Sequence, residues 1–445
     1  MASLLGPFNL MSGKTFLFTD LLKPSFILTL IIISLFTALL AGSYPAFVLS
    51  SFRPIDTLKA GMIGGSSRGL FRKITVVVQF TISIVLILFT IVTYRQLRYM
   101  LDKSLGFEKE NLIYFQMKGN IGDSYPVIKE EFLKDPAVLS VTASTNPPHN
   151  IGSNADNIWW EGKSPEEHTL VSMAGIDFDY VETMGIRMKS GRSFSKEYSV
   201  DIPHDTTGTF LINEQLEKLM GTPDAVGKQL KFGATRGQIV GVMKDFNFQS
   251  LHSKVDPLAL WIWPNRFLGF IFVRIKPGNL KESLTDIEKD WKRVVPLYPF
   301  DFHFIDQEIA NMYKVEEQAG TLLKYFSVLA ILIACIGLFG LATFTVEQRT
   351  KELGLRKALG ASGGSVVILI SGEFLRLLII SAAIALPLSL ILLHRYLASY
   401  GYHISLDFRI FITGVFIAFG VAGLAISYQL ITALNNNPAQ SLKYE

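Results

Sequence analysis

Two short patterns in this sequence resemble motifs that do chemistry, and neither predicts a site. Gly65-Ser66-Ser67-Arg68-Gly69 fits the G-x-S-x-G pattern of hydrolase nucleophile elbows, but that motif needs a strand before it and a helix after it. Here it lies in a basic loop between apolar stretches, and we interpret it as a flexible linker. Gly221 to Lys228 resembles a phosphate-binding loop. Its glycines are wrongly spaced, and Gln229 stands where Ser or Thr must reach magnesium, so no nucleotide site is predicted.

Metal-ligating side chains are equally sparse. The seven histidines are scattered, and the single cysteine, Cys335, lies inside an apolar run. No histidine stands at i, i+4 with another ligand on an expected helix, as a zinc helix requires. The sequence therefore predicts no catalytic residue, no metal and no cofactor held by this chain, which argues against a membrane-anchored enzyme.

One ionisable pair interrupts an otherwise apolar stretch. Glu373 and Arg376 lie one helical turn apart near its start, and this spacing allows them to pair. An intramembrane charge relay is one interpretation. An ion pair at the level of the lipid headgroups is the favoured one, because long side chains reach the interface there.

The elements around these residues are those of a membrane protein. Of the 445 residues 49% are hydrophobic and only 18% are charged, and the mean hydropathy is +0.34, outside the usual range of soluble domains. A bilayer crossing needs roughly 20 apolar residues. About five stretches qualify: 24–50, 74–94, 325–346, 366–393 and 410–434.

Basic residues between the spans set the expected orientation. Lys and Arg are frequent in the loops 53–73 and 349–357 and rarer between the last two spans, so the first two loops should be cytoplasmic. Five crossings would then place Met1 outside and Glu445 inside. The net charge of +4 is small and lies beside the spans, which indicates membrane orientation and no nucleic-acid partner.

The ends of the first and last spans repeat each other. Ser43-Tyr44 precedes Pro54 by the same interval as Ser427-Tyr428 precedes Pro438, and Leu-Lys follows each proline. A shared unit explains this spacing. Residues 1–60 are then the tail of an earlier unit, and one complete unit of four spans follows.

A long polar block separates the second and third spans. Residues 107–310 can bury their own core and mix strand-like runs with helical periodicity, which predicts an α+β domain. The strand-like runs are 112–117, 138–143, 169–174, 238–243 and 267–275, and the helical ones are 125–134 and 280–294.

The edges of this block carry apolar residues at heptad spacing. The spacing from Ile305 onward predicts one unbroken helix that continues into the third span, and a stripe after the second span faces it. The two would form a stalk able to act as a lever. Its expected residues are Leu97, Leu101, Ile309, Met312, Ala319 and Leu323, although Glu316 interrupts the seam and packing beneath the domain is the alternative.

The most specific string of the chain follows the third span. Glu347–Ser362, the signature segment, reads EQRTKELGLRKALGAS. Glu347 with Lys351 and Glu352 with Arg356 are spaced to pair on a helix, and Gly360 is placed to end it. A short helix on the inner membrane surface is predicted.

The signature segment resembles the cytoplasmic signature of the MacB/FtsX family of ABC permeases. The strings 211–215, 221–228, 239–248 and 250–252 also resemble the MacB-type extracytoplasmic domain, and 438–442 resembles the tail of an FtsX-type unit. The resemblance covers nearly the whole chain. It implies that the signature segment docks on an ATPase, through Glu347, Arg349, Lys351, Glu352, Gly354, Arg356, Lys357 and Gly360.

The resemblance implies a permease subunit rather than an enzyme. A separate cytoplasmic ATPase would bind the ATP, and the stalk would move the outer domain to export peptide, lipoprotein or drug-like substrates. The alternative is an FtsX-like regulator that activates a cell-wall hydrolase. Further implied partners are membrane lipid, a second permease unit or homodimer, and an extracytoplasmic adaptor or hydrolase. The expected site is the bacterial inner membrane.

The expected fold is an α-helical membrane protein with an inserted α+β extracytoplasmic domain, as the C-terminal portion of a two-unit permease. Small residues four apart, Gly414, Ala418 and Ala422, suit close packing of its last helix. The expected parts are the tail of a preceding unit (1–60), a span with stalk (70–106), the extracytoplasmic domain (107–310) and a stalk with three spans (311–445).

Overall fold

The chain forms two compact units in a computed structural model. The helical unit comprises Met1–Leu97, Val315–Leu397 and Ile404–Glu445, and the inserted domain comprises Arg98–Lys314 with Ala398–His403. The structure describes residues 2–50 and 66–435, except positions 165, 167, 205, 350–351, 353–354, 357–358 and 360–361. The predicted repeat around Pro54 and Pro438 therefore lies outside the described residues.

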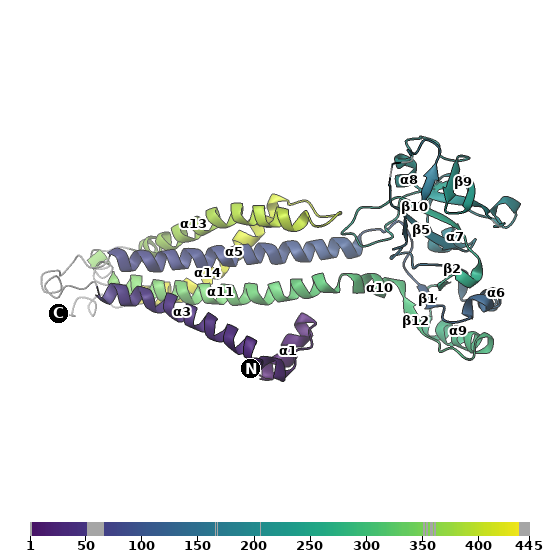
Figure 1. The fold of residues 1–445 in the computed structure, drawn as a ribbon. Coiled ribbons are helices and arrows are strands. Elements are labelled where there is room, and N and C mark those ends of the chain that lie inside the picture. Colours follow the sequence, from purple (N-terminus) through teal and green to yellow (C-terminus); the bar gives the residue numbers. More distant parts are fainter. Residues whose placement is uncertain are drawn as a thin grey trace. The chain divides into compact units, whose positions relative to one another are not determined.

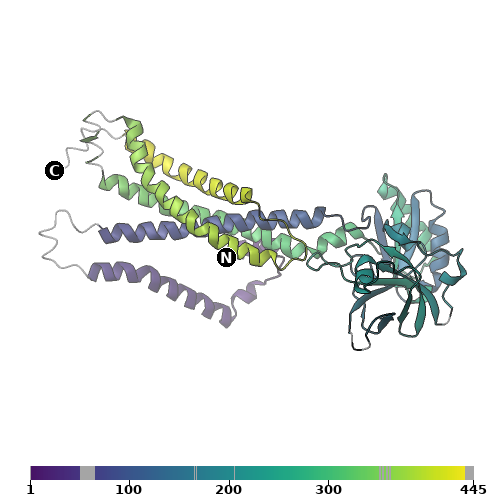
Figure 2. The same ribbon diagram turned by 90° about the horizontal axis from the view of Figure 1, so that it is seen from above.

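Four helices of the described chain are long and apolar enough to cross a membrane by length and composition. They lie side by side in the helical unit (Figures 1 and 2). They are α5 (Ser66–Asp102), α11 (Lys314–Gln348), α13 (Gly363–Leu397) and α14 (Phe408–Asn435). Because α5 already begins at Ser66, most of the Gly65–Gly69 stretch is helical and not the predicted linker.

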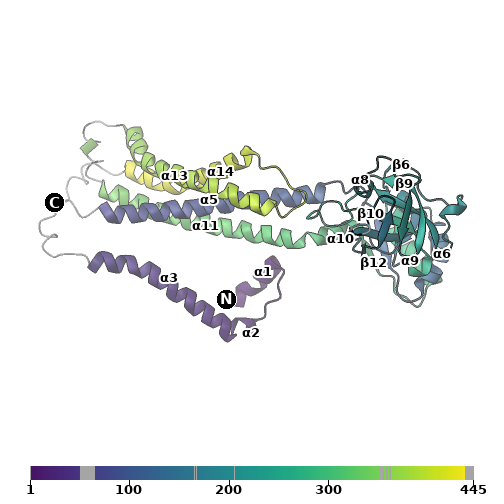
Figure 3. The same cartoon turned by 45° about the horizontal axis from the view of Figure 1, so that its top comes forward.

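Residues 2–50 form three further helices, α1 (Ala2–Ser12), α2 (Phe18–Leu21) and α3 (Pro24–Ser50). Helix α3 has the bounds predicted for the first span. Figure 3 shows that it follows α1 and α2 along the chain. Its described apolar part, Pro24–Leu39, is shorter than a bilayer crossing. It is not among the four spans identified.

Two hydrophobic clusters hold the four long helices together. Val76 and Phe80 of α5 pack with Leu338 of α11 and Phe374 of α13 in the first. The second joins the middle of α5 to α13 and α14, with Leu88, Ala385 and Ala418 among its members. The predicted close packing of α14 is present: Ala418 and Ala422 are buried, and a Cβ on Gly414 would meet Leu88 Cδ2 at 2.5 Å.

Within its described residues, the inserted domain is built on one mixed sheet of twelve strands. Its order is β12-β1-β11-β2-β5-β10-β7-β9-β8-β4, with β3 on β5 and β6 on β9. The pairs β5–β10 and β7–β9 are parallel and the others antiparallel. The strands are β1 (Leu112–Gln116), β2 (Val138–Ser144), β3 (Asn154–Ala155), β4 (Ile158–Trp160), β5 (Val171–Ile176), β6 (Met188–Gly191), β7 (Thr207–Asn213), β8 (Gln229–Phe232), β9 (Thr235–Met243), β10 (Leu258–Ile262), β11 (Phe270–Ile275) and β12 (Phe302–Phe304).

Each half of the sheet has its own core. Helices α6 (Ile121–Phe132) and α9 (Leu280–Val294) cover β1, β11 and β2, with Phe115 stacked on Trp291 at 4.9 Å between ring centres. Helix α8 (Glu214–Leu219) packs against the half formed by β7, β9 and β10. A further short helix is α7 (Tyr180–Met184). The predicted α+β class is confirmed, with α9 at its predicted bounds.

The predicted unbroken helix from Ile305 into the third span is wrong. Helix α10 (Ile305–Met312) is capped by Tyr313, and α11 begins at Lys314. The Tyr313 ring is buried, and its hydroxyl accepts a hydrogen bond from the Leu251 N–H at 3.0 Å. A tertiary contact of the inserted domain thus replaces the helical continuation that the apolar spacing allows.

Candidate functional site

The signature segment begins where α11 ends. Helix α11 ends at Gln348, and the Arg349 N–H still donates to the Thr345 carbonyl at 3.1 Å. The described part of the segment has exposed side chains at Glu347, Glu352 and Arg356. The predicted positions Lys351, Gly354, Lys357 and Gly360 lie outside the described residues, and the Glu347–Lys351 pair with them.

One predicted pair of the segment is present. Arg356 Nη2 lies 2.7 Å from Glu352 Oε1, at i, i+4 spacing. Leu355 and Leu359, which are also four residues apart, are 55% and 79% exposed. Exposed leucines beside an ion pair form the mixed apolar and charged surface that protein interfaces use.

The base of the segment is fixed by an ionic junction of three helices, formed by Lys73, Arg349 and Glu373. Glu373 of α13 accepts a hydrogen bond from Arg349 Nη2 at 3.0 Å. It also forms an ion pair with Lys73 of α5, whose Nζ lies 2.5 Å from Glu373 Oε1. The Glu373 side chain is 19% exposed, against 39% for Lys73 and 36% for Arg349. One carboxylate therefore ties the end of α11 to both neighbouring helices.

This junction corrects the predicted pair of Glu373 with Arg376. Arg376 is exposed, and the ion pairs between described residues do not include it. The local spacing allowed the pair, but two partners on other helices offer Glu373 two charged donors instead of one.

Polar and aromatic contacts continue from the junction along the helices. The Arg72 guanidinium lies 4.1 Å from the centre of the Phe344 ring. Gln429 Nε2 of α14 donates to Thr343 Oγ1 at 2.8 Å. These contacts join α5 and α14 to the last turns of α11, and hydrogen bonds of this kind favour association of helices in lipid.

The contact between α5 and α11 lies one residue away from the predicted seam. Thr90 and Ser327 share a hydrogen bond of 2.8 Å, and a Cβ on Gly320 would lie 3.5 Å from Thr93 Cγ2. Gly320, Ser327, Ala334 and Leu341 repeat every seven residues, and the last three are buried. The predicted Ala319 is exposed and Leu323 half-buried. The buried face of α11 is shifted by one residue from the predicted seam because Tyr313 interrupts the helix. The heptad spacing of the apolar residues before Tyr313 therefore does not continue into α11.

The remaining stalk residues lie on both sides of the division between the units. Leu97 and Leu101 near the end of α5 are half-buried, as is Met312, whereas Ile309 is buried.

A second junction, inside the inserted domain, escaped the sequence prediction. Residues 398–403 connect α13 to α14 along the chain but belong to this domain. The Gly401 N–H donates to the His252 carbonyl at 2.7 Å, and the Tyr402 N–H to the Leu251 carbonyl at 3.2 Å. The His252 and Tyr400 rings stack with 4.5 Å between centres.

The string Ser250-Leu251-His252 was singled out by its family resemblance, but nothing in it indicated this partner. Three separate segments meet there, because Tyr313 at the start of α11 also contacts Leu251.

The described residues hold no group of three or more His, Cys, Asp or Glu side chains that could bind a metal ion. Gly221 and Gly227 adopt positive φ angles of 68° and 85°. They shape the connection from α8 to β8, where the Gly227 N–H donates to the Ile239 carbonyl. The residues of the incomplete phosphate-loop pattern thus form a turn in this structure.

Two family models divide the chain between them. The FtsX-like permease C-terminal family matches residues 325–438, and the MacB-like periplasmic core domain matches residues 77–288. This chain is a permease of the MacB/FtsX family. Its inserted domain corresponds to the extracytoplasmic core domain, so the predicted fold class is confirmed.

The curated relatives of this permease share a low fraction of identical residues with it. The macrolide export ATP-binding/permease protein MacB of Neisseria meningitidis serogroup A is 24% identical over 212 residues, which are 44% of this chain and 31% of the relative. MacB of Shigella boydii serotype 4 is 21% identical over 318 residues, 67% of this chain and 44% of the relative. The chain thus spans about a third to under half of the length of these curated relatives.

A solved structure of the periplasmic region of MacB from Actinobacillus actinomycetemcomitans aligns with a TM-score of 0.34 and 16% identity. It covers 48% of this chain and 97% of that structure.

Proposed function

We propose that this permease couples ATP hydrolysis by a separate cytoplasmic ABC ATPase to movement of its inserted domain. The ATPase docks on the signature segment, with Glu347, Glu352, Leu355, Arg356 and Leu359 as the described contact residues. ATP binds to that partner, and this chain supplies no nucleotide ligand. The bacterial inner membrane is the proposed location.

The ionic junction is the observation that supports this proposal. It holds the base of the signature segment to α5 and α13 through Glu373. In the sequence, most of the inserted domain lies between helices α5 and α11, because α5 ends at Asp102 and α11 begins at Lys314. A displacement of the segment by an ATPase would therefore act directly on both helices that lead to the domain.

The proposed cargo is a peptide, lipoprotein or drug-like molecule taken up on the outer side of the membrane. The relatives named above are macrolide export proteins. If movement of the inserted domain drives export, the cargo need not pass between the membrane-spanning helices. A second permease unit or a second copy of the chain, membrane lipid and an extracytoplasmic adaptor are the further proposed partners.

The test is capture of a cytoplasmic ATPase by the detergent-solubilised chain. The native chain and a Glu347→Ala, Glu352→Ala, Arg356→Ala variant are each mixed with candidate ABC ATPases, and bound ATPase and ATP turnover are measured. All three side chains are exposed and stand outside the ionic junction, so the helices keep their contacts. We expect the variant to lose binding.

A matched control replaces an ion pair of the same spacing elsewhere. Glu288 and Lys292 on α9 lie four residues apart and 2.5 Å from each other, and both are exposed. The Glu288→Ala, Lys292→Ala variant should bind ATPase as the native chain does. Equal ATPase binding by all three proteins would remove the docking role from the signature segment. Capture of a cell-wall hydrolase in place of cargo would favour the FtsX-like regulator.

A further inference from the structure

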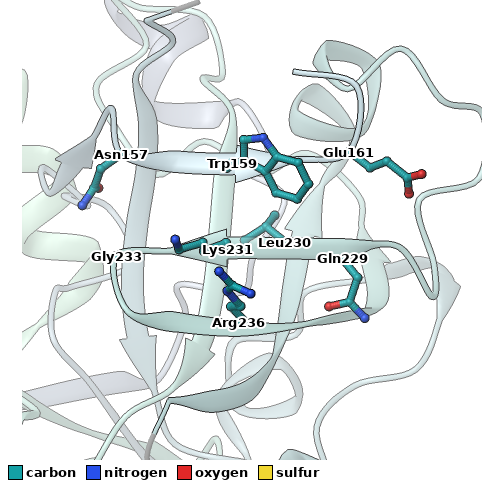
Figure 4. A pocket seen from close by; sticks show the side chains of 8 residues that line it. All are labelled: Asn157, Trp159, Glu161, Gln229, Leu230, Lys231, Gly233 and Arg236. Atoms are coloured by element: carbon teal, nitrogen blue, oxygen red, sulfur yellow. The ribbon is translucent and has the colours of Figure 1, made fainter. Parts of the chain in front are cut away.

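A hollow of about 940 Å³ lies on the ribbon formed by β4, β8 and β9 (Figure 4). We call it the ribbon pocket. This volume falls within the range of sites that hold small organic ligands. Its lining residues are Asn157, Trp159, Glu161, Gln229, Leu230, Lys231, Gly233 and Arg236.

Strand register explains how these side chains come to one face. Trp159 pairs with Lys231, and Lys231 pairs with Arg236, so the three form one row across the ribbon. Because side chains alternate along a strand, Glu161 and Gln229 fall on the same face one row further. The residues on either side of Trp159, Ile158 and Trp160, point to the opposite face and are buried in the core.

The row carries two features that the fold itself does not need. Trp159 is 45% exposed although its neighbour Trp160 is 2% exposed. Lys231 and Arg236 stand directly opposite each other, an arrangement of like charges that destabilises a strand pair. In the part of the chain that the structure describes, no ion pair includes Lys231, Arg236 or Glu161. Such departures from local consistency mark functional positions more often than structural ones.

An anion placed between Lys231 and Arg236 would remove this repulsion. A carboxylate can accept hydrogen bonds from both, and such charge-assisted bonds are the strong ones. An apolar group beside the carboxylate would lie on the Trp159 ring. Glu161 and Gln229, one row or roughly 7 Å along the strands, offer acceptors for N–H donors.

We propose that the ribbon pocket binds the C-terminal end of a peptide. The terminal carboxylate lies between Lys231 and Arg236, the apolar side chain of the last residue packs on Trp159, and the preceding N–H groups face Glu161 and Gln229. A peptide end combines a carboxylate, an apolar group and N–H donors at these distances. The pocket is formed by the inserted domain alone and does not depend on the ATPase proposal.

Fluorescence anisotropy on the full chain in detergent micelles tests this assignment. The probe is the fluorescein-labelled peptide Gly-Ser-Gly-Ser-Gly-Phe with a free C-terminal carboxylate. The same peptide with a C-terminal amide is its partner. We expect the amide to bind at least about tenfold more weakly, because it loses the charge-assisted bonds. Replacing Phe by Gly in the probe should weaken binding to the native chain.

Variants separate the pocket from general charge effects. Lys231→Ala and Arg236→Ala should each weaken binding of the free acid about tenfold and leave binding of the amide nearly unchanged. Trp159→Ala should abolish the preference for Phe over Gly. Lys276→Ala is the control, since Lys276 is an exposed lysine of the same domain outside the pocket.

All four substitutions lie on the surface, and equal thermal unfolding midpoints will establish that the variants are folded. Equal binding of acid and amide would overturn the proposal. So would unchanged affinity of the Lys231 and Arg236 variants, or no binding of the free acid up to about 1 mM.

Discussion

The inserted domain and the helical unit each hold a cluster of charged side chains, but the two clusters differ in burial and in the ratio of cations to carboxylates. In the inserted domain, Lys129 and the Tyr125 hydroxyl both donate to Asp177, and Lys129 also donates to Asp179. We call these four residues the tyrosine–lysine cluster. The Lys129 side chain is 13% exposed and that of Asp177 8%. In the ionic junction one carboxylate, Glu373, serves two more exposed cations.

The electrostatics of the tyrosine–lysine cluster show what burial requires. Burial acts to lower the pKa of Lys129, but Asp177 and Asp179 outweigh it, and the pKa lies above its usual value. Burial and the charge of Asp177 raise the pKa of Tyr125. Because the pKa of Lys129 is raised, its stabilising contribution is fully present below about pH 10.5 and is lost only as the pH rises through the folded value. The tyrosine–lysine cluster therefore stabilises the inserted domain throughout the physiological pH range.

The ionic junction differs because its partners come from three helices and remain partly open to water. Ion pairs of that exposure contribute little to stability. Their value here is the connection that they make at the end of α11. We infer that the tyrosine–lysine cluster keeps the inserted domain rigid, while the ionic junction is weak enough to rearrange.

The largest expected effect breaks the tyrosine–lysine cluster. Asp177→Ala leaves Lys129 largely buried with only Asp179 as partner, and removal of one member of a buried pair costs about 3–5 kcal/mol. Hydrogen exchange of the α6 amides in the full chain should accelerate by about a hundredfold or more. Asp179→Ala is the control: Asp179 is 54% exposed, and its loss should cost below about 1 kcal/mol. Equal acceleration in both variants would contradict the distinction between buried and exposed pairs.

A buried histidine of the inserted domain should make the stability of that domain fall as the pH falls, whereas the contribution of Lys129 is lost as the pH rises. His149 is 8% exposed, its Nδ1 has no hydrogen-bond partner among the described residues, and burial lowers its pKa from 6.5 to about 4. The unfolded chain therefore binds the proton first as pH falls. Stability is constant above about pH 6.5 and falls between pH 6.5 and 4, by an amount on the order of 3 kcal/mol.

Thermal unfolding followed by tryptophan fluorescence between pH 8 and 4.5 measures this loss. His149→Gln cannot take up the proton, so its unfolding midpoint should fall less steeply with acid than that of the native chain. His168→Gln, at an exposed position, should retain the native pH dependence. Identical slopes for the native chain and His149→Gln would show that His149 is not the acid-sensitive group.

Elements governed by local pattern were predictable from the sequence. The four long helices follow from apolar stretches with few charges, and α9 follows from amphipathic spacing that buries Ile287 and Trp291 on one side. Paired strands such as β1 and β2 followed from β-branched and aromatic runs. In each case the residues that determine the element lie within it.

The candidate sites were less predictable because their residues meet through tertiary structure. Glu373 was assigned to Arg376 one turn away, but its partners are Lys73 and Arg349 on other helices. Tyr313 ends α10 through a contact with Leu251, which no spacing near Tyr313 indicates. The stacking of His252 on Tyr400 joins residues far apart in the chain. Local spacing gives the possible pairs, and only the fold selects among them.

The smallest effect on stability, and the sharpest test of the comparison, comes from Glu373→Gln in the ionic junction. The substitution keeps the shape of the side chain, replaces one acceptor oxygen by an NH2 donor and removes the charge that Lys73 and Arg349 share. Because these pairs are partly exposed, the loss should be below about 1 kcal/mol, and ATPase binding to the signature segment should persist. Exchange of the Arg349 amide, which is bonded to Thr345, should nevertheless accelerate about threefold to fivefold as the end of α11 loosens.

Arg376→Gln is the matched control on the same helix. Arg376 lies one turn from Glu373 but is exposed and outside the ionic junction, so its loss should leave the Arg349 amide unchanged. If Glu373→Gln also leaves that amide unchanged, the end of α11 is held by the apolar contacts of Leu341 and Val346 and not by charge. Glu373→Gln could instead destabilise the whole helical unit as strongly as Asp177→Ala destabilises the inserted domain. The ionic junction would then be a rigid structural contact, like the tyrosine–lysine cluster. The rearrangement required for coupling must then lie elsewhere, with the contact of Tyr313 and Leu251 as the next position to examine.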